Sequence, residues 1–267
     1  ISSKSVTVTF NANGCTSVAG SASGTVYNAG TTVSVTVPNA TLNATWKNLK
    51  ASTSSTANTA SAGTAVGSAI SVSVGSTSTT ATAYYICNKT VTVTFNNNGC
   101  TSADGTATFT VINGGTSGSV TVPSATMNSG WTSLGASTTA TSTTQGVAMG
   151  ETMSISIGTS SGATTRYYNC SKAAVTKSVT YEKGSNVSAI GKTSDSCTIG
   201  AVYNGASQSG SCTVTLPSIT ANTGYTSVGW STTNGATSGT AAGGSYSLSS
   251  NTTHAPKGTL ILSILVL

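Results

Sequence analysis

The chain contains nearly the same segment three times, and this repeat limits the folds that it can adopt. The stretch SVTVTFNANGCTS begins at Ser5, TVTVTFNNNGCTS begins at Thr90, and a more divergent copy opens with KSVTYEKGSN at Lys177. Repetition with a long, regular period is typical of tandem modules. We therefore expect three small modules, at residues 1–89, 90–176 and 177–258, followed by a short segment at 259–267.

Each copy carries the same order of β signals. An opening strand alternates apolar and polar residues, and in the first two copies an Asn-Gly pair such as Asn13 and Gly14 follows it and favours a turn. A second alternating strand ends at a proline, because proline cannot donate to a β ladder; these prolines are Pro38, Pro123 and Pro217. Ser, Thr and Gly disfavour helices. The sequence predicts an all-β fold in which one copy leads directly into the next.

Charged residues are scarce, which excludes some classes of partner. They make up 5% of the chain, against about 25% in an ordinary soluble protein. The net charge of +6 comes from ten scattered bases, whereas nucleic-acid binding requires a concentrated basic patch. We expect no nucleic-acid partner. A protein with few surface charges has low solubility as a free molecule, which suits a protein that is assembled or anchored.

The chain offers no convincing set of catalytic residues. Glycoside hydrolysis needs two carboxylates near one point, but the acids fall in different copies or loops; they are Asp104, Glu151, Glu182 and Asp195. The single histidine, His254, has no serine with a nucleophile-elbow motif to act on, and no CxxC occurs. We expect no enzymatic activity, no metal site and no cofactor.

The order of motifs resembles a known family. VTFNANG, a proline, GYTSVGWST and then GTA before a final strand resemble the internalin B-type repeat, also called the Listeria–Bacteroides repeat. The third copy matches best, at Gly224, Tyr225, Gly229 and Trp230. The first two copies depart from it, with Trp46 and Trp131 in place of Tyr225 and with Ala51 and Ala136 in place of Trp230. The resemblance implies a β-grasp-like module in a secreted or cell-surface bacterial protein, used as a spacer or adhesive stalk and without catalytic residues.

Six cysteines, two in each copy, indicate disulfides and an oxidising, extracellular location; they are Cys15, Cys87, Cys100, Cys170, Cys197 and Cys212. A straight strand between Cys87 and Cys100 would hold that pair too far apart to bridge. In the β-grasp-like fold that the resemblance implies, the first and last strands run parallel. That arrangement favours a Cys15–Cys87 bridge and a Cys100–Cys170 bridge. Cys197 and Cys212 would then clip a hairpin in the third copy.

The tryptophans allow two interpretations. Trp46, Trp131 and Trp230 can stack on sugar rings, as aromatic platforms do in carbohydrate-binding modules. Alternatively, they fill the small core of each module. Their recurrence at similar places in the repeat favours the core.

The last nine residues, TLILSILVL, stand where a fourth copy would open. They are too short for a membrane-spanning helix, which needs about 20 residues, so we expect no transmembrane segment. A continuous apolar run fits a strand that is buried on both faces. In one alternative the tail folds back and completes the third module. In the other, which we favour, it docks on a neighbouring subunit by strand addition through Leu260, Ile261, Leu262, Ile264, Leu265, Val266 and Leu267.

Head-to-tail docking of this kind does not close and would build a filament. The sequence therefore predicts a non-catalytic extracellular structural protein, a subunit of a pilus-like bacterial surface filament whose partners are copies of itself. The alternative is a cell-surface stalk or adhesin that binds host or glycan ligands.

Overall fold

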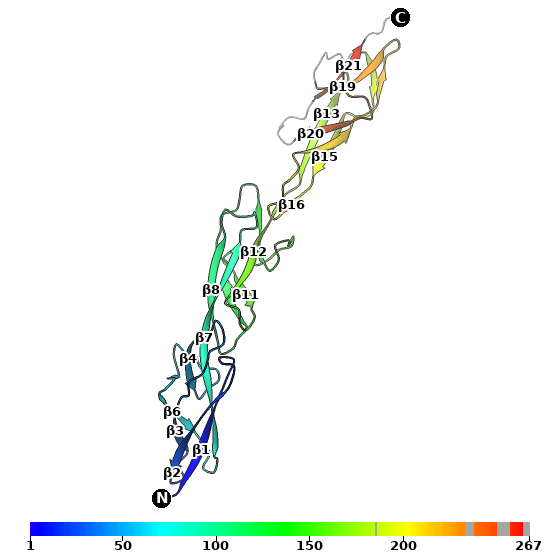
Figure 1. Cartoon of the computed structure of the whole chain (residues 1–267). Coiled ribbons are helices and arrows are strands. Elements are labelled where there is room, and N and C mark those ends of the chain that lie inside the picture. Colours follow the sequence, from blue (N-terminus) through cyan, green and yellow to red (C-terminus); the bar gives the residue numbers. More distant parts are fainter. Residues whose placement is uncertain (185, 233–237, 250–256, 264–267) are drawn as a thin grey trace. The chain divides into compact units, whose positions relative to one another are not determined.

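The computed structural model describes residues 1–184, 186–232, 238–249 and 257–263, and every regular element in them is a β-strand (Figure 1). The predicted all-β fold is confirmed. The chain divides into two compact units, Ile1–Met127 with Leu134–Asn169, and Asn128–Ser133 with Cys170–Leu267. The first unit holds most of modules 1 and 2, and module 3 belongs to the second.

Module 1 is built on a sheet whose first and last strands run parallel, as the β-grasp-like expectation requires. Its strands are β1 (Ser3–Asn11), β2 (Gly20–Tyr27), β3 (Thr32–Thr36), β4 (Lys47–Ser52), β5 (Thr64–Ala65), β6 (Ala69–Ser73) and the first part of β7 (Thr80–Asn96). β1 pairs antiparallel with β2 and parallel with β7, and β4 pairs with β5 and β7. β3 and β6 form a separate antiparallel pair.

The module 1 core lies between these two sheets. Along β1 and β3 every second side chain is buried, because alternate residues of a strand point to the same face. Val6, Val8 and Phe10 of β1 therefore belong to one apolar core with Val33 of β3. β3 ends two residues before Pro38, as the proline predicts.

Module 2 repeats this plan. It uses the second part of β7 with β8 (Gly105–Ile112), β9 (Ser117–Thr121), β10 (Thr132–Ser137), β11 (Thr152–Ser156) and β12 (Ala163–Lys172). β7 pairs antiparallel with β8 and parallel with β12, and β9 pairs with β11. In module 2, β7 thus takes the place that β1 has in module 1. β8 takes the place of β2, and β12 takes the place of the last, parallel strand.

β7 belongs to two modules at once. Its residues Thr80–Tyr84 pair in parallel with β1, and its residues Thr92–Asn96 pair in parallel with β12. The expected boundary between residues 89 and 90 falls in the middle of this strand. The prediction that one copy leads directly into the next is confirmed here, and it takes the form of one uninterrupted 17-residue strand.

Module 3 keeps the parallel pair and changes its surroundings. Its strands are β13 (Val175–Glu182), β14 (Val187–Ile190), β15 (Ser194–Ile199), β16 (Val202–Tyr203), β17 (Ser211–Thr215), β18 (Ile219–Ala221), β19 (Thr226–Ser231), β20 (Ser245–Ser249) and β21 (Lys257–Ser263). One sheet has the order β15-β13-β21-β19, while β17 pairs with β20 and β14 with β18. β16 pairs with the end of β12.

The C-terminal segment closes module 3 within the same chain. β21 pairs in parallel with β13 and antiparallel with β19, so both of its backbone edges have partners. This corrects the expectation of an inter-subunit strand for Leu260, Ile261 and Leu262. The module needs a last strand parallel to its first, and this segment supplies it. The remaining predicted assembly residues, Ile264, Leu265, Val266 and Leu267, lie outside the described residues.

Candidate functional site

The candidate site is built around a disulfide bond. Cys15 is joined to Cys87 with their Cα atoms 5.7 Å apart, the pairing that the parallel first and last strands favoured. Cys100 and Cys170 are disulfide-bonded as well. Both sulfur-bearing residues of the first bridge are fully buried, and Cys87 lies on β7, the strand that the first two modules share.

The third bridge does not clip a hairpin. It joins Cys197 to Cys212, with the Cα atoms 5.9 Å apart. Cys197 lies on β15, whose partner is β13, and Cys212 lies on β17, whose partner is β20. This bridge therefore connects two separate sheets, one that contains β13 and β15 and one that contains β17 and β20. β15 and β17 are not paired with each other as a hairpin would require.

An Asn-Gly turn lies beside the Cys15–Cys87 bridge. Asn13 and Gly14 both adopt positive φ, 50° and 73°, which these residue types tolerate best. The Asn13 side-chain amide donates to the carbonyl oxygens of Ser55 at 2.8 Å and Tyr85 at 3.0 Å. The turn is thereby tied to β7 and to the loop after β4.

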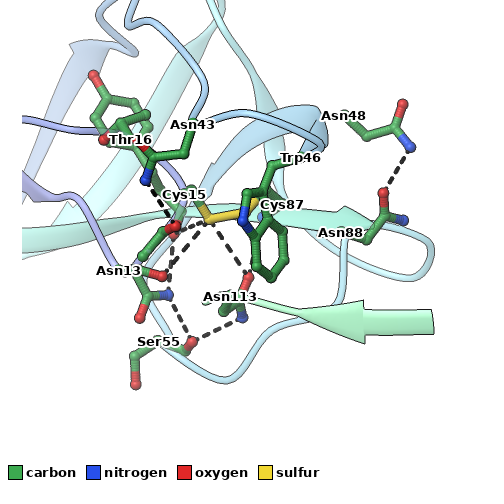
Figure 2. The surroundings of a disulfide bond; sticks show 12 residues. Asn13, Cys15, Thr16, Asn43, Trp46, Asn48, Ser55, Cys87, Asn88 and Asn113 are labelled. Atoms are coloured by element: carbon green, nitrogen blue, oxygen red, sulfur yellow. Dashed lines mark hydrogen bonds between the residues drawn. A yellow bond between two sulfur atoms is a disulfide. The ribbon is translucent and has the colours of Figure 1, made fainter. Parts of the chain in front are cut away.

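A second Asn-Gly turn, from module 2, docks on the same bridge. Asn113 donates its backbone N–H to the Cys87 carbonyl at 3.1 Å, and its side-chain Oδ1 accepts from the Cys87 N–H at 3.0 Å. Its Nδ2 donates to the carbonyl oxygens of Ser55 and Ala57, both at 2.9 Å. Figure 2 shows the Asn13 and Asn113 amides both reaching Ser55 beside the disulfide.

The two turns touch through their glycines. A Cβ atom on Gly14 would lie 2.5 Å from Gly114 Cα, and one on Gly114 would lie 2.9 Å from Gly14 Cα. Any side chain at either position would force the turns apart. Glycine is thus required here twice over, for its positive φ and for the close approach of two backbones.

The other half of the contact is a buried tryptophan and a buried lysine. Trp46, on the loop before β4, donates from Nε1 to the Thr159 carbonyl of module 2 at 3.2 Å, and its neighbour Thr45 donates from Oγ1 to the Ser160 carbonyl at 3.3 Å. Lys89 of β7 donates from Nζ to the carbonyl oxygens of Gly158 and Thr159 at 3.2 and 2.6 Å. We call this set of contacts, together with the two Asn-Gly turns, the joint.

The ammonium group of Lys89 is enclosed by the joint. The residue is 1% exposed, and its Nζ lies 4.7 Å from the centre of the Trp46 ring, within the range of a cation–π interaction. Two carbonyl oxygens and a π face replace water around the cation. Loss of water disfavours the charged form and lowers the pKa of Lys89 from its ordinary value. The joint therefore holds a cation through neutral groups of both modules.

Part of this arrangement recurs at the end of module 2. Asn98 and Gly99 again adopt positive φ, and Asn98 Nδ2 donates to the Ala140 carbonyl at 2.7 Å. In the second unit, Asn204 Oδ1 accepts from the Cys170 N–H at 3.1 Å, and the Asn204 N–H donates to the Cys170 carbonyl at 3.0 Å. These bonds repeat those of Asn113 with Cys87.

In each module, a buried aromatic side chain donates a hydrogen bond to the carbonyl of the proline that follows the second alternating strand. In modules 1 and 2 a tyrosine of the last strand donates to the proline carbonyl, Tyr85 to Pro38 at 3.1 Å and Tyr168 to Pro123 at 3.0 Å. In module 3 the donor is Trp230 of β19, whose Nε1 lies 2.9 Å from the Pro217 carbonyl. At the place of Trp230 the first two copies carry Ala51 and Ala136, which have no side-chain donor.

The tryptophans do not form three matching platforms for sugars. Trp46 is 5% exposed and Trp230 is 3% exposed, and each ring has an assigned partner in the fold. Neither can present a face to a glycan. Trp131 is half-buried. Trp46 and Trp230 are thus buried, as the core interpretation expects, although Trp46 lies where modules 1 and 2 meet; neither ring is exposed as a glycan-stacking residue would be.

The residues of the joint were only partly visible in the sequence. The repeat indicates the Asn13–Gly14 turn and the cysteines, but it marks neither Asn113 nor Lys89, which is one of ten scattered bases. The signal that could have found Lys89 is its recurrence, because Lys4 and Lys89 stand at the same place before Val6 and Val91. Its burial depends on Trp46, which is distant in sequence.

Within the described part of the chain, no group of three or more His, Cys, Asp or Glu side chains is placed to hold a metal ion. No helix in that part is long and apolar enough to cross a membrane. Comparison with family models and with curated proteins finds no match for the chain.

Proposed function

We propose that this chain is a non-catalytic structural protein of the extracellular space, a subunit of a surface filament or appendage that assembles with copies of itself. The observation that carries the proposal is the joint. Modules 1 and 2 share β7 and bury a tryptophan and a lysine between them. Such a contact restricts movement of one module against the other, which is useful to a protein that transmits force or holds a length.

The chemistry of the joint supports a mechanical role. A lysine that loses water is stable only while its replacement partners stay in place, because an unpaired buried charge is costly. Any hinge movement that opens the joint separates Trp46 and Lys89 from the carbonyl oxygens of module 2 to which they donate. The cost of that separation favours one relative placement of modules 1 and 2 over a range of loose ones.

The covalent bridges fit an oxidising, extracellular environment. All six cysteines are disulfide-bonded, and such bonds persist outside the reducing cytosol. Each bridge also adds stability to a module whose core is small. Secretion and display at a cell surface are part of the proposal and agree with the resemblance to internalin B-type repeats.

The low charge of the molecular surface is what supports the proposed self-assembly. Only 5% of the residues are charged, and the exposed strands carry Ser and Thr instead. A surface with so few charges resists association weakly. Since β21 is paired within its own chain, we propose that assembly uses other surfaces than this strand.

Electron microscopy of the oxidised full chain, with sedimentation velocity over a wide concentration range, tests this proposal. We expect regular fibres and a sedimentation coefficient that rises with concentration. A protein that remains monomeric at all concentrations, in the presence and absence of salt, would contradict the assembly that we propose. Trp46→Ala should make the fibres irregular by loosening the joint, whereas Val18→Ala, at an exposed side chain of the same module, should leave them unchanged.

A further inference from the structure

The N-terminal face of module 1 repeats the module 2 half of the joint. Lys4 donates from Nζ to the carbonyl oxygens of Gly75 and Ser76, both at 2.6 Å. Lys89 makes the same two bonds to Gly158 and Thr159, which follow β11 as Gly75 and Ser76 follow β6. Both lysines precede the apolar alternation of an opening strand. Module 1 thus carries the same cation on the same loop.

The turn after the second strand is repeated as well. The Asn28 N–H donates to the Ser2 carbonyl at 3.0 Å, as the Asn113 N–H donates to the Cys87 carbonyl at 3.1 Å. Asn28 has a φ of 53° and Asn113 has a φ of 50°. The backbone of the docking turn is therefore in place at this face, and Ser2 stands where Cys87 stands in the joint.

This face is hollow where the joint is filled. Ser2, Ser3, Lys4, Val26, Ala29 and Ser76 line a hollow of about 210 Å³. The matching residues in the joint are Lys89, at the module boundary in β7, with Gly114 and Thr159 of module 2, and they receive the Trp46 end of module 1. The hollow offers a lysine ammonium, a carbonyl oxygen of Ser76 and an apolar wall from Val26. These groups suit an aromatic side chain that also carries a hydrogen-bond donor.

Module 3 presents such a side chain in the same turn. The Trp46 N–H donates to the Asn43 carbonyl at 3.2 Å, and the Trp131 N–H donates to the Asn128 carbonyl at 3.1 Å. The Tyr225 N–H makes the equivalent bond to the Asn222 carbonyl at 3.1 Å. Tyr225 is half-buried, and its ring and hydroxyl supply the aromatic face and the donor that Trp46 supplies in the joint.

We infer that the hollow on module 1 receives Tyr225 of a second copy of this chain, so that chains join head to tail through a copy of the joint. This rests on the proposed self-assembly and names the surfaces that it uses. The Tyr225 ring lies over the Lys4 ammonium, and its hydroxyl donates to the Ser76 carbonyl. A contact between two different surfaces of the same molecule repeats from chain to chain and produces a polymer.

Ala29 makes this contact weaker than the joint inside the chain. It stands where Gly114 stands in module 2 and adopts a positive φ of 59°. A Cβ atom at Gly114 would lie 2.9 Å from the backbone of the docked turn, so the methyl group of Ala29 keeps a partner backbone farther away. We therefore expect the contact between chains to hold less tightly than the joint within a chain.

Sedimentation velocity and electron microscopy of the oxidised full chain test the inference. Tyr225→Ala and Lys4→Met should each raise the concentration for half-assembly at least tenfold, while Tyr225→Trp and Ala29→Gly should lower it. Val18→Ala is the control and should leave it unchanged. Circular dichroism checks that each variant is folded.

A mixture of two variants gives the sharpest readout. A Lys4→Met chain keeps its Tyr225, and a Tyr225→Ala chain keeps its hollow, so together they should form a one-to-one dimer and no polymer. Polymers that form equally well from either variant alone would overturn the inference and leave the proposed self-assembly standing. A wild-type chain that never associates would overturn both.

Discussion

At the scale of single residues, three buried tyrosines test whether hydrogen bonding or packing decides the stability of each module. Tyr85 and Tyr168 donate to proline carbonyls, and each ring packs against a phenylalanine with the ring centres 5.8 Å apart. Tyr181 is equally buried, but its hydroxyl has no hydrogen-bond partner among the described residues. The three side chains are chemically identical, so their differences come from their partners.

Replacing each tyrosine by phenylalanine removes only the hydroxyl. We expect Tyr85→Phe and Tyr168→Phe to lower the free energy of unfolding by about 1 kcal/mol, because a satisfied pair is lost. Tyr181→Phe should be neutral or stabilising, since it removes a buried hydroxyl without a bond. Urea unfolding of the oxidised chain, followed by circular dichroism, measures the three changes. Equal losses at all three positions would contradict this assignment.

Alkaline titration tests the same residues. Burial raises the pKa of Tyr85, Tyr168 and Tyr181, so the folded state keeps these protons at a pH where the unfolded state loses them. The resulting stability is fully present below the unfolded pKa of 10.0 and is lost as the pH rises through the folded values. The lowered pKa of Lys89 has the opposite effect on stability. Below its unfolded pKa of 10.5 the unfolded chain holds this proton more readily than the folded chain, so stability from Lys89 rises with pH in that range. We expect a late component in the tyrosinate absorbance that is smaller in Tyr85→Phe.

At the scale of elements, the molecule is held by turns and bridges that connect strands rather than by the strands alone. The Asn13–Gly14 and Asn113–Gly114 turns meet at the Cys15–Cys87 bridge, and the bridge lies on a strand of both modules. Changes in these short segments should therefore have larger effects than changes within exposed strand faces.

Glycine substitutions separate backbone strain from contact. Gly14→Ala places a Cβ atom 2.5 Å from Gly114 Cα and also requires an alanine at a φ of 73°. Gly67→Ala is the matched control, because its φ is 81° and nothing lies within 4 Å of the added atom. The control should lose about 1 kcal/mol of unfolding free energy from the left-handed backbone. Gly14→Ala should lose clearly more, as measured by urea unfolding; a loss no larger than that of Gly67→Ala would argue against the close contact of the two turns.

The bridges should differ in strength according to the loops that they close. Cys15–Cys87 spans a sequence separation of 72, and Cys197–Cys212 spans 15. On the chain-entropy estimate the longer loop is worth about 4 kcal/mol and the shorter loop about 3 kcal/mol. Paired Cys→Ser variants, compared by urea unfolding, should show the larger loss for the first bridge. The reverse order would mean that contacts around Cys197 and Cys212 outweigh loop entropy.

At the scale of the whole molecule, the shared strand makes modules 1 and 2 one cooperative body. Opening either module disturbs β7, because each contributes strands that pair along it. Hydrogen exchange should therefore give equal free energies of opening for the amides of residues 83–86 and of residues 91–95. Trp46→Ala should separate the two values by weakening the joint, and Val18→Ala should not. Values that already differ widely in the wild type would contradict a single cooperative body.

The sequence alone predicts the alternation of the strands, their ends at prolines and the turns at Asn-Gly pairs. These features are local, because a strand period, a missing N–H or a positive φ is a property of a few adjacent residues. The tail shows the limit of such patterns. Its apolar run predicts a buried strand, but only tertiary structure decides which sheet receives it, and β13 and β19 of the same chain do so.

Tertiary structure alone decided which residues meet. The donor to the proline carbonyl is Tyr85 of β7 in module 1 and Trp230 of β19 in module 3, and the sequence near each proline does not show which residue reaches it. Lys89 is buried because Trp46 and the loop after β11 cover it, and its equivalent, Lys4, has no such cover from the described residues. Lys4 and Lys89 thus stand in the same local sequence but differ in burial, because burial depends on what packs against a residue and not on its neighbours in the chain.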